Sequence, residues 1–205
     1  MAGGLLQIVA QGAQDVYLTG NPQITFFKGV YRRHTNFSME AVKQTFNGTP
    51  NFGNDFSCQI QRNADLIHKM YLQTTLPSIN ISSKVSSNVY GAFRWLNWIG
   101  HILIETVSIS IGGAKIDEHT GEWLHIWNEL TQKPGHKEAY AEMVGNVPKL
   151  TQIYGSNDSS KDNSTGEYTL YIPLQFWFCR NPGLSIPLIA LQYHDIHINL
   201  KLRTF

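Results

Sequence analysis

Alternation of apolar and polar residues with a period of two recurs along this 205-residue chain and constrains its fold most strongly. The clearest case is IHINLKL at 196–202, where isoleucine and leucine alternate with polar residues, and the pattern returns at 56–61, 106–111 and 168–172. Successive side chains of a β-strand point to opposite faces of a sheet, so each segment predicts a strand with one buried face. The sequence therefore predicts an all-β protein.

Two further segments, 39–46 and 66–76, add strand candidates, and the second ends at Pro77, which cannot donate a hydrogen bond within a sheet. The segments 77–91 and 156–166 are rich in serine and asparagine and are typical of exposed loops. Many strands joined by long connections favour a sandwich with Greek-key crossings over simple hairpins. A chain of this length fits one such domain.

One segment between the strands has helical periodicity. Within 118–132, Trp123, Trp127 and Leu130 recur at i, i+4 and i+7, and the pattern stops before a Pro-Gly pair. We therefore expect an amphipathic helix whose tryptophans pack inward on the sandwich, with a second short helix over 138–144. Together they predict a helical excursion between two strands.

Residue types that carry catalysis are present, but not at catalytic spacings. His119, Glu122 and His125 fall at i, i+3 and i+6, whereas a helical zinc pair uses i and i+4. His194 and His197 lie three positions apart in a predicted strand and so point to opposite faces. No nucleophile elbow or phosphate-binding glycine motif is present. The sequence predicts no catalytic residue, no metal, no cofactor and no enzymatic turnover.

The amino-acid composition and net charge indicate which classes of partner the chain can bind. Charged residues make up 15% of the chain, against about 25% in ordinary soluble domains, which favours contact with other protein. The formal net charge is +1, so no electrostatic attraction to nucleic acid or an anionic membrane is expected. Neither a secretory signal nor an apolar run of ~18 residues is evident, so we expect a soluble, unsecreted chain. The two cysteines, Cys58 and Cys179, are expected to be buried reduced thiols.

Five segments spread over nearly the whole chain carry a resemblance to one protein family. They are GAQDVYLTGNPQITFFKGVYRRHTNF at 12–37, PNFG at 50–53, IGGAKID at 111–117, GEW at 121–123 and LQFWFCRNPGLSIPLIALQYHDIHINLKLR at 174–203. In this order they resemble the N-terminal part of the major capsid proteins of nucleocytoplasmic large DNA viruses, especially those of the mimivirus and algal-virus branch. The resemblance covers only the first of the two jelly rolls of that family.

The resemblance implies a structural role. It implies a jelly-roll sandwich, the N-terminal half of a double jelly roll, in a subunit that trimerises into the capsomers of an icosahedral shell. The implied partners are other copies of the chain, other capsid proteins and minor capsid proteins, with no direct contact to nucleic acid and only an indirect one to the internal viral membrane. The implied location is the virion capsid, assembled in the host cytoplasm.

The chain divides, in this interpretation, into an N-terminal arm at 1–37 with a short strand and helix, and a jelly-roll domain at 38–205. With eight strands labelled B to I, the candidates run from B near Met39 to H near His194, so we expect the last strand to be missing. The arm is expected to dock beneath the sandwich and to hold neighbouring subunits or a minor capsid protein. Its candidate interface residues are Phe26, Phe27, Val30, Tyr31, Arg32 and Arg33.

Two alternatives stay open beside the capsomer subunit. One is a single-jelly-roll minor capsid or vertex protein. The other is a carbohydrate-binding jelly roll, supported by Trp95 and Trp98 as potential stacking platforms for sugars. Glycosylation sequons that are expected in loops occur at Asn80, Asn157 and Asn163.

Overall fold

The computed structural model describes most of the chain, namely residues 36–49, 51–81, 92–155 and 164–204. The chain divides into two units, Met1–Ala41 and Val42–Phe205, and every described helix and strand belongs to the second. None of the described helices is long and apolar enough to cross a membrane.

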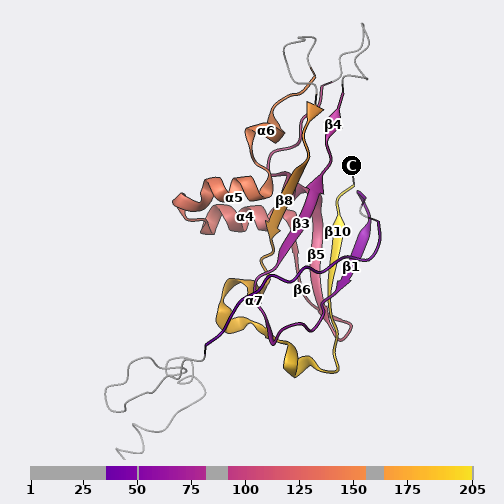
Figure 1. Cartoon of the computed structure of the whole chain (residues 1–205), viewed down its shortest axis with the longest axis vertical. Coiled ribbons are helices and arrows are strands. Elements are labelled where there is room, and N and C mark those ends of the chain that lie inside the picture. The colour runs from indigo at the N-terminus through magenta and orange to yellow at the C-terminus, as the bar shows by residue number, and fades with distance from the viewer. Residues whose placement is uncertain (1–35, 50, 82–91, 156–163, 205) are drawn as a thin grey trace, which may run out of the picture. The chain divides into compact units, whose positions relative to one another are not determined.

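A four-stranded antiparallel sheet forms one layer of the second unit (Figure 1). In spatial order its strands are β1 (Asp55–Gln59), β10 (Ile196–Leu202), β5 (Ile104–Ile111) and β6 (Ala114–Thr120). The register places Ile198 opposite both Cys58 and Ile109, and all three side chains are buried. The strands predicted from alternation at 56–61, 106–111 and 196–202 are therefore confirmed, because one face of each is buried.

A tight turn at Gly112 and Gly113 joins β5 to β6. Both residues have positive φ values, 57° and 84°, which a type I′ turn requires at its two central positions. Side-chain bulk is also excluded at Gly112, where an added Cβ would lie 2.7 Å from Nδ1 of His194. The glycine pair therefore serves the hairpin.

The second layer is an interrupted two-stranded ribbon. Its strands are β2 (Leu66–Ile67), β3 (Tyr71–Leu76) and β4 (Ile79–Asn80), which pair in turn with β9 (Ile186–Pro187), β8 (Tyr168–Pro173) and β7 (Ser164–Thr165). The ladder breaks where the chain between β8 and β9 forms α7 (Trp177–Arg180) and the 3-10 turn η3 (Pro182–Leu184). There His68 Nδ1 lies 3.0 Å from the carbonyl oxygen of Phe178.

Two strand predictions need correction. The expected strand over 66–76 is two strands, because the chain at 68–70 contacts α7 instead of continuing the ladder. The strand expected over 39–46 is wrong, since residues 36–46 form no strand in the described part of the chain. Alternation alone does not make a strand, because the backbone also needs a hydrogen-bonded neighbour.

The core lies between the sheet and the ribbon. Buried side chains from both layers form one hydrophobic cluster, which includes Ile104, Val107, Ile109 and Ile198 from the sheet and Leu72, Leu76, Leu170 and Ile172 from the ribbon. The opposite face of β3 and β8 is exposed, with Tyr71 and Tyr171 among its side chains. This one-sided burial explains the alternation that is visible in the sequence.

Short helices flank the ribbon. They are α3 (Ile99–Leu103), α4 (Gly121–Thr131), α5 (Lys137–Val144) and α6 (Pro148–Thr151), with 3-10 turns η2 (Pro134–His136) and η4 (Leu188–Leu191). Both α4 and α5 pack on α3, and α5 also packs beside β8. The Thr120 hydroxyl accepts a hydrogen bond from the Trp123 N–H and caps α4. The expected helix at 118–132 therefore begins three residues later, because 118–120 belong to β6.

The buried face of α4 differs from the predicted one. Gly121, Leu124 and Asn128 face the interior, whereas Trp123 is 36% exposed and Leu130 is 78% exposed. The prediction that the tryptophans pack inward on the sandwich is wrong. The reason is the close approach of α4 to α3, where a Cβ on Gly121 would lie only 2.0 Å from the carbonyl oxygen of His101. A tryptophan on that face would not fit.

Candidate assembly surface

The outward face of α4 carries two neighbouring indole rings together with exposed aliphatic side chains. We call Trp123, Ile126, Trp127, Leu130 and Arg180 the tryptophan face. The two indole rings lie 5.6 Å apart, and the Arg180 guanidinium carbon lies 4.2 Å from the centroid of the Trp127 ring. Arg180 also donates a hydrogen bond to the carbonyl oxygen of Gln175 at 3.0 Å. The cation–π contact therefore links α4 to α7 and holds the indoles in place.

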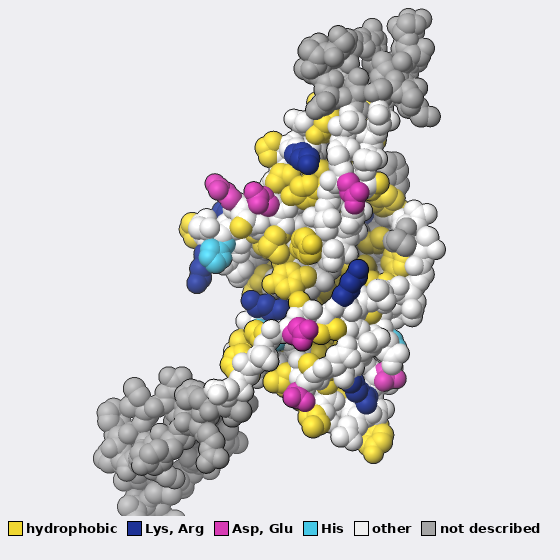
Figure 2. Space-filling view, in the orientation of Figure 1, with side chains coloured by type: hydrophobic (Ala, Val, Ile, Leu, Met, Phe, Trp, Pro, Cys, Tyr) yellow, Lys and Arg dark blue, Asp and Glu magenta, His cyan; other side chains and the backbone are white. Residues whose placement is uncertain are grey.

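Apolar side chains on this face are open to solvent. Ile126 is 51% exposed and lies one turn from Leu130, which is more exposed still. Figure 2 shows hydrophobic side chains gathered across the middle of the viewed face, with lysine and arginine side chains among them. Exposed aliphatic side chains beside aromatic rings are typical of a surface that contacts another protein.

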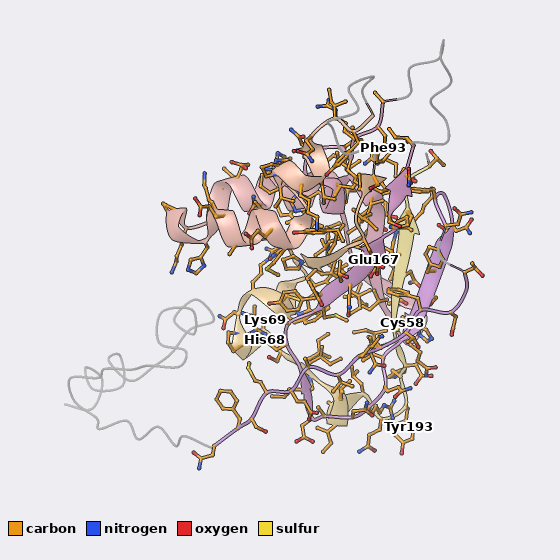
Figure 3. All side chains as sticks on the ribbon, turned by 45° about the horizontal axis from the view of Figure 1, so that its top comes forward. Cys58, His68, Lys69, Phe93, Glu167 and Tyr193 are labelled. Carbon is orange, nitrogen blue, oxygen red and sulfur yellow. The ribbon has the colours of Figure 1, made fainter. Side chains whose placement is uncertain are left out.

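A groove of about 640 Å³ adjoins the tryptophan face. Its apolar lining includes Met70, Tyr140 and Met143, and its cations include Lys69 and Arg180. Figure 3 shows Lys69 beside His68, close to the segment that contains α7. No carboxylate is present among the described residues that line the groove. The groove therefore combines apolar contact area with positive charge.

The groove has no activated nucleophile. Burial raises the pKa of the Cys179 thiol to about 11, so the thiol is protonated at neutral pH. Cys58 and Cys179 are both buried free thiols, as expected. In the described part of the chain, no group of three or more His, Cys, Asp or Glu residues could hold a metal ion. The expected absence of catalysis stays a prediction.

The predicted histidine sites are not brought together. His119 is buried in β6 with its ring edge against Phe176, whereas His125 lies on α4 near His101. Glu122, between them, is exposed and paired with Arg203. His101 is not among the predicted residues, because nothing in the local sequence indicates that α3 and α4 cross at that residue.

Several of the predicted site residues lie outside the described part of the chain. They are the sequons at Asn157 and Asn163 and the candidate interface residues of the N-terminal arm, Phe26, Phe27, Val30, Tyr31, Arg32 and Arg33. Asn80 is exposed, but it lies in β4 opposite Ser164 and not in a loop. A strand end still leaves its side chain accessible, so the sequon at Asn80 remains a prediction.

The two tryptophans proposed as sugar platforms do not offer open faces. Trp95 is buried and lies edge-on to Phe93, with ring centroids 5.1 Å apart. Trp98 is partly buried, and its indole stacks on the His101 imidazole at 5.7 Å. The carbohydrate-binding alternative therefore loses the feature that supported it.

The four-stranded sheet has two edge strands, β1 and β6. β1 is one edge of the four-stranded sheet, and Asn47 covers part of it by donating its N–H to the Ser57 carbonyl at 3.0 Å. β6 is the opposite edge and carries Ile116, which is 53% exposed. Lys115 and Glu118 form an ion pair on the same strand. Charged residues on an edge strand discourage uncontrolled pairing with other chains.

Comparison with known proteins identifies the family. The family described as "Major capsid protein N-terminus" matches residues 25–205. The major capsid protein of Pyramimonas orientalis virus is 55% identical over 202 residues, which cover 98% of this chain and 47% of that protein. The major capsid protein of Phaeocystis pouchetii virus is 52% identical over 218 residues, which cover 99% of this chain and 41% of that protein.

The fold is similar to that of a solved capsid chain. The quasi-atomic model of the PBCV-1 virus capsid matches with a TM-score of 0.65 and 32% identity, over 88% of this chain and 38% of that chain. This chain thus spans less than half the length of each of these three relatives. The antiparallel sheets described above are consistent with the jelly-roll type of these relatives. The chain belongs to the family of major capsid proteins of nucleocytoplasmic large DNA viruses.

Proposed function

We propose that this chain is a structural subunit of an icosahedral viral capsid and that it self-associates into trimeric capsomers. The observation that carries the proposal is the match to the family over 25–205, which includes every residue of the described sandwich. The low charge content and the exposed tryptophan face support it, since a shell protein works through surfaces repeated under symmetry.

The two layers correspond, in this proposal, to the two sheets of the first jelly roll of a double jelly roll. A jelly roll has eight strands. The described sandwich supplies the four strands of the sheet and, in the ribbon, two long strands that are each interrupted twice, β2–β3–β4 and β7–β8–β9. The arm at 1–37 and the domain at 38–205 then form the N-terminal part of a longer subunit. Minor capsid proteins and other copies are its partners in the virion, with assembly in the host cytoplasm.

The tryptophan face is the surface on which we place contact with a second copy. Its apolar residues are anchored by Arg180 and stay exposed in the isolated chain. Burying such a patch between copies removes apolar area from water, which drives association.

Sedimentation of Leu130→Asp tests this surface. Leu130 is 78% exposed, so the substitution leaves the fold intact but places a charge in the proposed contact. We expect a lower trimer fraction at matched concentration and an unchanged unfolding midpoint. Ile189→Asp is the matched control, because Ile189 is 66% exposed on η4, away from α4, and should leave the trimer fraction unchanged.

Other outcomes would contradict parts of the proposal. A Leu130→Asp chain that still forms normal trimers would remove the tryptophan face as the contact. Pentamers in place of trimers would indicate a vertex protein, the single-jelly-roll alternative. A monomer at every concentration would contradict self-association by this part of the subunit.

A further inference from the structure

Three helices meet at a cluster of aromatic and imidazole rings. We call Trp98, His101, His125 and Tyr140 the histidine junction, in which α3 contributes His101, α4 contributes His125 and α5 contributes Tyr140. The His101 and His125 ring centroids lie 5.7 Å apart, and His101 Nε2 lies 2.8 Å from the Tyr140 hydroxyl. The junction therefore joins α4 and α5, the two longest described helices, to α3.

The described part of the junction offers no hydrogen-bond acceptor for a second N–H group on His101. Nε2 of His101 is engaged with Tyr140, and the side chain is 2% exposed. Among the described atoms, neither Nδ1 of His101 nor Nδ1 of His125 has a hydrogen-bond partner. A neutral imidazole can leave one nitrogen unprotonated, whereas an imidazolium must present two N–H donors. Protonation would therefore bury a donor without an acceptor.

The groups around His101 provide no compensating negative charge. α4 presents His125, which would repel a second imidazolium, and α5 presents Tyr140, whose pKa is raised by burial so that it stays neutral. On its other side α3 packs through Gly100 on the apolar side chains of Val144 and Ile172. Burial, and then the neighbouring His125, lower the pKa of His101 to about 4.

We propose that the histidine junction opens at acid pH, when protonation of His101 separates α4 and α5 from α3 while the β-sandwich stays folded. Separation of the helices lets water solvate the His101 imidazolium ring, which removes the free-energy cost of burying its charge. Because Tyr140 also lines the groove beside the tryptophan face, the opening would change that surface. The opening itself does not depend on the proposed capsid function.

The size of the effect follows from linkage. The pKa of His101 is lowered when the helices are closed and ordinary when they are open. The closed state is therefore fully stable at pH values above the ordinary pKa of histidine, and it loses stability as the pH falls from there toward 4. For His101 alone, we expect the opening equilibrium to rise about 30-fold between pH 7.5 and pH 5.0.

Hydrogen exchange on the intact 205-residue chain tests the proposal. We expect protection factors, normalised for the intrinsic exchange rate at each pH, to fall about 30-fold in α4 and α5 between pH 7.5 and pH 5.0. Protection in β5 and β10 should change far less. Equal losses in the helices and the strands would show global acid unfolding and overturn a local opening, as would unchanged protection in α4 and α5.

Variants separate the junction from other titrations. His101→Gln with His125→Gln keeps polar side chains that do not titrate, and we expect it to lose the pH dependence of α4 and α5 protection. His136→Gln is the matched control, because His136 is exposed just before α5 and its replacement should preserve the pH response. A double variant that responds like the parent would overturn the proposal.

A direct titration covers the case in which the double variant does not fold. Nuclear magnetic resonance of the unmodified chain follows the imidazole protons of His101 and His125 through the same pH range. We expect protonation of His101 to coincide with loss of α4 and α5 protection. Protonation of His101 near pH 6.5, with both helices still fully protected, would show that the junction tolerates the charge and would overturn the proposal.

Discussion

At the scale of single residues, exposure along α4 shows which side chains stabilise the fold. Leu124 is fully buried, whereas Leu130, only six positions later in the same helix, is mostly exposed. Trp127 lies between these extremes, with Arg180 stacked on its ring. The fold therefore depends on the buried aliphatic side chain of α4, and the indoles remain available for contact with another chain.

Alanine substitutions at the two leucines should separate these roles. We expect Leu124→Ala to lower the free energy of unfolding by about 2–5 kcal/mol, because it leaves a cavity in a fully buried site. Leu130→Ala should change it by less than about 0.5 kcal/mol, as exposed substitutions do. Urea denaturation monitored by tryptophan fluorescence measures both. Equal midpoints for the two variants would mean that Leu124 does not contribute to the core as its burial indicates.

At the scale of elements, the crossing of α3 and α4 depends on a residue without a side chain. A Cβ on Gly121 would lie 2.0 Å from the His101 carbonyl oxygen and 2.6 Å from that of Ile104. Both obstacles are backbone atoms, so no rotamer change relieves them. The start of α4, immediately after β6, is therefore determined by how closely the two helices approach.

Gly121→Ala should be among the most destabilising single substitutions in the chain. We expect a loss of about 3 kcal/mol or more, because α4 must move away from α3. Gly135→Ala is the control, since nothing lies within 4 Å of its added Cβ and we expect a change of less than about 0.5 kcal/mol. Thermal denaturation of both variants makes the comparison. A Gly121→Ala protein with an unchanged midpoint would contradict the close helix crossing.

At the scale of the whole molecule, folding and assembly should be separable. The described core is built entirely from residues after 55, in the sheet, the ribbon and the flanking helices. The apolar and basic residues Phe26 to Arg33 belong to the N-terminal unit, Met1–Ala41. An arm of this kind contributes contacts between chains more than core within one chain.

Deletion of the first ~35 residues tests that separation. We expect the shortened chain to keep the unfolding midpoint of the parent within the error of the measurement, because the described core is retained. We expect it to form fewer trimers in light scattering, since the arm is proposed to hold neighbouring subunits. Normal trimers from the shortened chain would show that the arm is dispensable for assembly.

The sequence by itself determined the strands whose alternation reflects one-sided burial, and the family of the chain. These features are local or are carried in continuous segments, so a single stretch contains the whole signal. Only the tertiary structure decided which face of α4 is buried, since apolar periodicity cannot distinguish a core face from an exposed apolar face. The same holds for the contact of Arg180 with Trp127 and for the meeting of His101 with His125, because both join residues that are distant in sequence. Such contacts depend on how closely helices cross, and backbone distances of that kind leave no periodic pattern in the chain.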